Sequence, residues 1–275
     1  MSKLQLLFDG GSDQLLKLIN AVAKTAPGLS DEGRQALADE CVGYYNEAKA
    51  VELVTRILDH VDALFVMDAD ETEACFLSLF SVVDRAAPAE QPGLLTAILD
   101  KLRVRQGDGI LVLRLLGDMI NLLPESYGEM RVAVLSAALA LSAGNAQLLT
   151  MLEPTVARFC EEGGAAAAWR VETLRNTAEA ASATPGKAVL QKGCLQQLLA
   201  ASEPSAVEAE AAQALLLAIA DPVWTQKNQP ALLDMPAIAH LRGHATHGWL
   251  VTLLDTLLRG TLDDFETFKG AHQSQ

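Results

Sequence analysis

Apolar residues recur along most of this chain with the spacing of one face of an α-helix. Leucine, isoleucine and valine fall at positions i, i+3, i+4 and i+7, and no stretch alternates residue by residue as a β-strand would. The pattern therefore predicts an all-α protein. The clearest faces are Leu94, Leu95, Ile98, Leu99 and Leu102; Val112, Leu115, Leu116, Met119 and Leu123; and Leu250, Leu253, Leu254, Leu257 and Leu258.

Capping signals indicate where these helices begin and end. A hydroxyl or carboxylate before an apolar run can satisfy the free amides of a first turn, and glycine can end a helix in the left-handed conformation. The predicted starts are Ser126 with Glu129, Ser205 with Glu208, Thr184 before Pro185, Asp221 before Pro222, and Thr261 with Asp263 and Asp264. The predicted stops are Gly107 and Gly109 around Asp108, Gly144-Asn145, Gly163-Gly164, and residues 182–186.

The helices are expected to form stacked pairs. Pairs begin near Gln91, Ser126, Ala166 and Ser205, which is the period of TPR- and HEAT-like helical repeats. One pair cannot bury its apolar face alone, so neighbouring pairs must cover it. We therefore expect a right-handed α-solenoid of stacked helix pairs. Residues 1–88 form its N-terminal helical region and residues 89–275 its repeat region, in one continuous array.

Charge and cysteine content narrow the function classes. The 275 residues include 21 Lys plus Arg against 35 Asp plus Glu, a formal net charge of -14. This charge opposes binding to a phosphate backbone, and direct DNA binding is not expected. The four cysteines are far apart and sit among apolar residues, which predicts buried reduced thiols rather than a metal site or disulfides. No signal peptide or membrane span is predicted, which favours the cytoplasm.

Three histidines offer the most specific alternative to a purely structural protein. On one helix, His240, His244 and His247 would share a face and could bind a metal ion. Gly243 and Gly248 interrupt the segment, however, and no acidic residue lies nearby in sequence to orient a ring. We favour a polar junction between two helices. A metal-dependent enzyme remains the competing hypothesis.

A cluster of acidic residues is better explained by the start of a helix than by a calcium site. Asp68, Asp70, Glu71 and Glu73 would suit calcium only with glycine at the sixth loop position and glutamate at the twelfth, and the sequence has neither there. We expect Asp70 to cap a helix, with the following acids in its first turn. Phosphate-binding and nucleophile-elbow signatures are absent from the sequence. No cofactor is therefore expected, and the chain is predicted not to be an enzyme.

The C-terminal two thirds resembles the PCI family, which is named for the proteasome lid, the COP9 signalosome and initiation factor 3. Residues 95–123 have the family's helix, charged turn and Leu-rich helix, and residues 127–140 resemble its next helix. The most specific stretch is 207–241, VEAEAAQALLLAIADPVWTQKNQPALLDMPAIAHL, with a helix, Asp-Pro near an aromatic residue, and a Leu-Pro-apolar-Leu passage. Leu250–Leu254 with Phe265 and Phe268 resembles a Leu/Phe-rich helix pair.

The resemblance implies a scaffold fold and a set of partners. It is nearest to the PCI subunits of eukaryotic translation initiation factor 3, which implies assembly with other PCI and MPN subunits and indirect contact with the small ribosomal subunit. The COP9 signalosome and the proteasome lid are the alternative complexes. A complete PCI module continues into a winged helix, but no strand pattern for one is evident here, so we expect the helical-repeat portion alone.

Large aromatic side chains are the expected partner contacts. The chain has only three tryptophans, and burial in the helical array is the simplest expectation for each. Tryptophan is also enriched at interface hot spots. The predicted partner-binding residues are Trp224, Trp249, Phe265 and Phe268.

Overall fold

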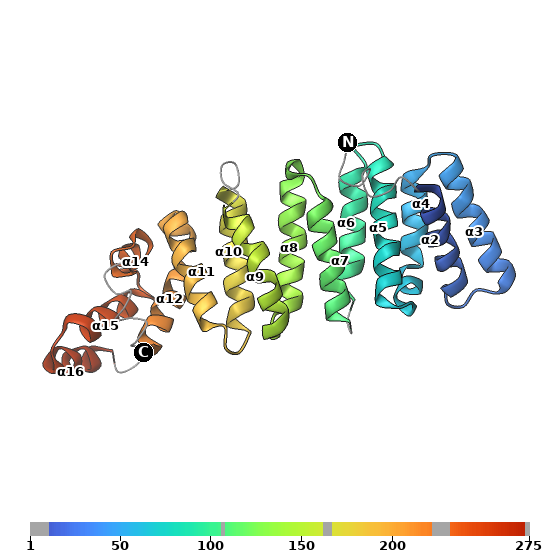
Figure 1. Cartoon of the computed structure of the whole chain (residues 1–275). Coiled ribbons are helices and arrows are strands. Elements are labelled where there is room, and N and C mark those ends of the chain that lie inside the picture. Colours follow the sequence, from blue (N-terminus) through green and yellow to red (C-terminus); the bar gives the residue numbers. More distant parts are fainter. Residues whose placement is uncertain (1–10, 106–107, 162–166, 222–231, 273–275) are drawn as a thin grey trace. The chain divides into compact units, whose positions relative to one another are not determined.

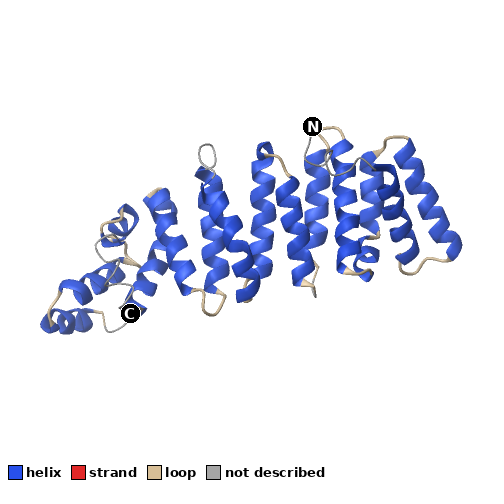
Figure 2. Ribbon diagram, viewed as in Figure 1, coloured by secondary structure: helices blue, strands red, loops and turns tan. Residues whose placement is uncertain are grey.

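The computed structural model describes residues 11–105, 108–161, 167–221 and 232–272, and these residues form helices joined by short turns. Figure 2 shows no strand within the described ranges. The chain divides into two compact units, Met1–Leu141 and Ser142–Gln275. Each unit is described separately below.

Unit 1 begins with a group of three α-helices and a short 3-10 helix, and continues as further helices packed in sequence (Figure 1). Helix α2 packs against both α3 and α5, α4 packs against α5 and α6, and α5 also packs against α7. Its elements are α2 (Gly11–Thr25), α3 (Asp31–Asn46), α4 (Ala50–Asp59), η1 (Val61–Val66), α5 (Ala69–Arg85), α6 (Gln91–Arg103), α7 (Gly109–Leu122), η2 (Glu125–Tyr127) and α8 (Gly128–Ser142).

Unit 2 is also built by packing each helix on its neighbours in sequence. Helix α10 packs between α9 and α11, and α12 contacts α11, α14 and α15. Its elements are α9 (Ala146–Glu161), α10 (Ala167–Ser182), α11 (Ala188–Ala201), η3 (Pro204–Ala206), α12 (Glu208–Ala220), α14 (Pro236–Leu241), α15 (Gly248–Arg259) and α16 (Leu262–Ala271).

The all-α prediction and the packed helix pairs are confirmed. Helices α6, α8, α10 and α12 begin within three residues of the predicted pair starts. The core of unit 1 includes the predicted apolar faces of residues 94–102 and 112–119, and Leu18, Ile57, Phe76 and Ile98 are almost fully buried in it. Phe76 lies on α5, for which no apolar face was predicted. A separate cluster fills unit 2, with Leu198, Leu215, Ile238 and Leu241 at its centre. Burial of such faces is the main stabilising contribution in a protein of this kind.

Several predicted caps were wrong because short 3-10 turns precede the helices. Ser126 lies inside η2 and Ser205 inside η3, so α8 and α12 begin after them and neither serine is the cap. Val207 precedes α12 instead and makes no side-chain capping bond. The predicted stop at Gly144 is confirmed, since this residue has φ +81°, a conformation that favours glycine.

Thr184 differs from its predicted role in a way that stabilises unit 2. It does not cap α11, which follows Lys187. Its hydroxyl is buried, donates to the Ala180 carbonyl at 2.7 Å and accepts from the Gly144 amide at 2.9 Å. The side chain therefore ties the end of α10 to the turn that precedes α9. A buried hydroxyl with both roles filled avoids the cost of an unsatisfied polar group.

Candidate functional site

The predicted aromatic contact residues lie on the last two helices of unit 2, apart from Trp224, which is outside the described residues. Trp249, in the first turn of α15, is partly buried against the core cluster of unit 2. Phe265 and Phe268 lie on α16 and are also partly buried. The Phe268 ring lies 4.6 Å from the ring of His272. All three described side chains thus keep some area in contact with solvent.

Helix α16 packs against α15, but none of its residues is fully buried. Its first residue, Leu262, has 75% of its surface exposed, and Leu257 of α15 is also exposed. A helix with this composition gains more burial when a partner covers it. The role of Trp249, Phe265 and Phe268 in partner binding stays a prediction.

Capping hydrogen bonds fix the start of α16, the helix that carries Phe265 and Phe268. The helix start predicted at Thr261 is confirmed, and Thr261 and Asp264 form a capping box there: the Thr261 hydroxyl accepts a hydrogen bond from the Asp264 amide at 3.3 Å, and the Asp264 carboxylate accepts one from the Thr261 amide at 2.8 Å. The Thr261 amide and the Thr261 hydroxyl both donate hydrogen bonds to the Asp264 carboxylate, and these lower the pKa of the Asp264 carboxyl. Gly260, just before, lies so close to α15 that an added Cβ would be 2.6 Å from the Thr256 carbonyl oxygen.

The three histidines meet at a junction between helices, as the polar interpretation expected. His240 is in α14, His247 precedes α15, and His244 lies between them. The His244 and His247 rings stack, with centroids 5.1 Å apart and planes 11° apart. Among the described residues, no group of three His, Cys, Asp or Glu side chains is placed to hold a metal ion.

Sequence reasoning missed the carboxylate of this junction. Glu208, at the start of α12, lies 2.9 Å from Nε2 of His240 and 3.6 Å from Nε2 of His244. It is 32 residues from His240 in the chain, so no local spacing could reveal it. The Thr246 amide donates to Nδ1 of His244 at 3.3 Å, which places the proton of a neutral ring on the nitrogen facing Glu208. The arrangement links α12 to α14.

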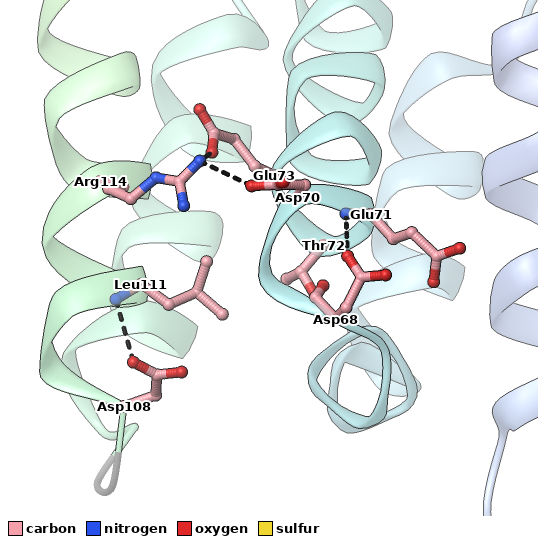
Figure 3. A network of polar contacts seen from close by, with 8 residues as sticks. All are labelled: Asp68, Asp70, Glu71, Thr72, Glu73, Asp108, Leu111 and Arg114. Carbon is pink, nitrogen blue, oxygen red and sulfur yellow. Dashed lines mark hydrogen bonds and ion pairs between the residues drawn. The ribbon is translucent and has the colours of Figure 1, made fainter.

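The acidic cluster of unit 1 begins a helix, but at a different residue from the one predicted. Asp68, not Asp70, is the N-cap of α5, and its carboxylate accepts the Glu71 amide at 2.8 Å (Figure 3). Asp70 and Glu71 then occupy the first turn, where their negative charges interact favourably with the positive end of the helix dipole. Asp108 caps α7 in the same way, by accepting the Leu111 amide at 3.1 Å.

Asp70, which the sequence predicted as the cap, instead takes part in a set of ion pairs that forms a bridge between α5 and α7. Figure 3 shows Arg114 reaching from α7 toward Asp70 and Glu73 of α5. The guanidinium contacts Glu73 and lies 3.1 Å from Asp70. Arg114 and Asp70 are well exposed, so the pairs add little stability. They connect α5 to α7.

Asp118, one turn after Arg114, is the most perturbed acid of this bridge. Desolvation by burial, the nearby charge of Glu73 and a hydrogen bond with Glu73 together raise the pKa of its carboxyl from 3.8 to about 6, although the charge of Arg114 lowers it. Its Oδ2 atom is buried without a hydrogen-bond partner. The carboxyl is therefore poised to hold a proton in mildly acidic solution.

The cysteines are free thiols, as the sequence predicted. Cys41, Cys75 and Cys194 are buried, and Cys160 is partly buried. Burial raises the pKa of Cys41 and Cys75 to about 11 and that of Cys194 to about 12. Because the thiolate is the reactive form, these three side chains are poor nucleophiles and poor metal ligands.

Of the Asp-Pro motif that follows α12, only Asp221 lies within the described residues. Asp221 follows the last residue of α12, and its carboxylate binds the ammonium group of Lys192 in α11. The Lys192 side chain is only 7% exposed, so the carboxylate compensates a charge that has been taken out of water. The helix start predicted at Pro222 lies outside the described residues.

No protein-family model matches the chain, and no curated protein matches it. Among the helices described, none has both the length and the apolar character needed to cross a membrane.

Proposed function

We propose that this chain is a non-catalytic scaffold subunit of eukaryotic translation initiation factor 3, equivalent to its m subunit. In this proposal its helix pairs form the right-handed PCI-type solenoid, and it acts in the cytoplasm. It supports assembly of the factor's core and, through that core, initiation on the small ribosomal subunit.

The observation that carries the proposal is the order of elements in the C-terminal segment that resembles the family. Helix α12 ends at Ala220 just before Asp221, α14 begins at Pro236, and the Leu/Phe-rich pair α15 and α16 follows. In the described parts of residues 207–268, this order of helices supports the PCI resemblance. The resemblance thus falls on helix boundaries, whereas a chance match of leucines need not do so.

The charge and the exposed apolar residues support protein partners rather than RNA. A net charge of -14 repels a phosphate backbone. Helix α16, with no fully buried residue, offers apolar and aromatic side chains of the kind that dominate binding energy at protein interfaces. We therefore place neighbouring PCI and MPN subunits on α15 and α16.

Affinity purification from the source cells tests the proposal. The tagged full-length chain should recover initiation factor 3 subunits at physiological salt, identified by mass spectrometry. Recovery of none of them would contradict the proposal. Recovery of COP9 signalosome or proteasome-lid subunits instead would retain a PCI scaffold and move it to the alternative complex.

A matched pair of variants locates the contact. Leu262→Asp places a charge on the exposed start of α16 and should reduce the recovered subunits by at least about tenfold. Val189→Asp makes the same change at an exposed position of α11 and should leave recovery unchanged. Equal losses in the two variants would argue against the α16 contact.

A further inference from the structure

A hollow of about 720 Å³ lies between α6, α7 and α8, entirely within unit 1. Its floor is apolar and is formed by Leu102 of α6 with Val112 and Leu116 of α7. Its other wall is α8, which contributes three small residues, Ser136, Ala137 and Ala140, together with Leu141. Interiors are normally packed without space of this size. The hollow exists because small side chains on one helix face large ones on two others.

The rim of this groove has the opposite charge to the chain as a whole. Arg103 and Arg105 line it, and no acidic residue is among the described residues of its lining, although acids outnumber bases 35 to 21 in the sequence. Arg105 is held by Asp62 and lies over the ring of Phe65. Arg103 is 44% exposed and keeps a looser contact, 3.6 Å from Asp100.

Arg103 also spans the groove. Its guanidinium donates to the carbonyl oxygen of Ala133 in α8 at 3.2 Å, so it closes one end of the space between α6 and α8. An arginine has five N–H donors, and a carboxylate can take two of them side by side. A ligand carboxylate arriving here would meet a fixed, partly desolvated cation beside an apolar floor.

Two exposed apolar residues are next in sequence to residues that line the groove. Val104 follows Arg103 and is 76% exposed, and Ile110 follows Gly109 and is 54% exposed. The volume falls within the roughly 300–1,000 Å³ typical of binding pockets. The groove is open along helices rather than enclosed, and this geometry suits a segment of another polypeptide lying against three helices.

We propose that this groove binds a short amphipathic peptide segment of a partner protein, with a large apolar side chain seated between α7 and α8 and an acidic residue paired with Arg103. The apolar anchor fills the space left by the alanines of α8. The acidic residue provides specificity, because a basic segment would be repelled by both arginines. The groove is separate from the C-terminal segment on which the proposed function rests, so either can fail alone.

Peptide selection on the full-length chain tests this proposal. Random peptides displayed on phage are selected on the wild-type protein after depletion on Ala140→Trp, which fills the groove from an exposed position. The enriched peptides should share a large apolar residue with Asp or Glu within one helical turn. Failure to enrich any peptide that requires Ala140, or enrichment of basic peptides, would overturn the proposal.

Fluorescence anisotropy with the best selected peptide, synthesised and labelled, then measures each contribution. Ala140→Trp should weaken binding by at least about tenfold and Arg103→Glu by at least about fivefold. The matched controls are Ala36→Trp on the exposed face of α3 and Arg85→Glu in the last turn of α5. Ala36→Trp adds the same bulk as Ala140→Trp, and Arg85→Glu makes the same change of charge as Arg103→Glu. Both controls should leave the affinity for the peptide within about twofold of the wild-type value.

Folding of each variant is checked by circular dichroism and thermal unfolding before binding is compared. Loss of binding in Arg85→Glu as large as in Arg103→Glu would reduce the effect to net charge and overturn the assignment of Arg103. Equal binding of a selected peptide to wild type and Ala140→Trp would overturn the groove itself.

Discussion

Replacing Asp118 with asparagine should stabilise the protein at neutral pH. The carboxyl of Asp118 is half-buried beside Glu73, and its pKa is raised from 3.8 to about 6. At neutral pH the native state must therefore hold a carboxylate in a place that disfavours it. Asparagine has nearly the same shape and no charge, so it removes this penalty while keeping a polar group.

The sign follows from proton linkage. Because the folded-state pKa is higher than the unfolded one, the native state binds more protons between 3.8 and about 6. The destabilisation is absent below pH 3.8, grows as the pH rises through this window, and is complete above about 6. A pKa difference of this size corresponds to at most about 3 kcal/mol. Solvent screening of a half-buried group reduces the expectation to about 1–2 kcal/mol.

Urea denaturation followed by far-ultraviolet circular dichroism measures the effect. At about pH 7.5, Asp118→Asn should raise the free energy of unfolding by about 1–2 kcal/mol, and at about pH 4 by about a fifth of that. Asp39→Asn, on the exposed surface of α3, changes the net charge equally and serves as the control. An equal gain at both pH values, or a loss at neutral pH, would refute the reasoning.

Three further predictions concern other parts of the chain: two substitutions and the reactivity of the cysteines. Gly260→Ala should cost about 1–3 kcal/mol in thermal or urea unfolding because its Cβ would meet the Thr256 carbonyl, whereas Gly270→Ala, which has open space around it, should cost nothing. Thr184→Val should cost about 1–3 kcal/mol in the same assay by removing two buried hydrogen bonds. Alkylation followed by mass spectrometry should modify Cys160 first, and a faster reaction at a buried cysteine would contradict its assigned environment.

The helices could be predicted from the sequence because each follows from local periodicity. The apolar faces around Ile98 and Leu115 are buried as expected, since the 3.6-residue period places their members on one side. The capping rules were less reliable. At Ser126 and Ser205 a 3-10 turn intervenes, so α8 begins one residue and α12 two residues later than a cap at these serines requires. A local rule that recognises residue types cannot detect this displacement.

Contacts between helices could not be predicted in the same way. Arg114 lies 41 residues from Glu73 and 44 from Asp70 in the chain, and their meeting depends on how α5 and α7 pack. The hydroxyl of Thr184 similarly binds Gly144, 40 residues away, in preference to a local cap. Such partners become visible only when helix packing is known, because sequence separation carries no signal of proximity.

The small side chains along α8 have an evolutionary consequence. Ala140 contributes to the hollow of unit 1 but lies at the surface, so its replacement by a bulky residue would alter recognition with little cost to folding. A lineage could therefore gain or lose an interaction at this place by a single codon change. Selection for a stable helical core and selection for a binding preference would then act on different positions of the same helix.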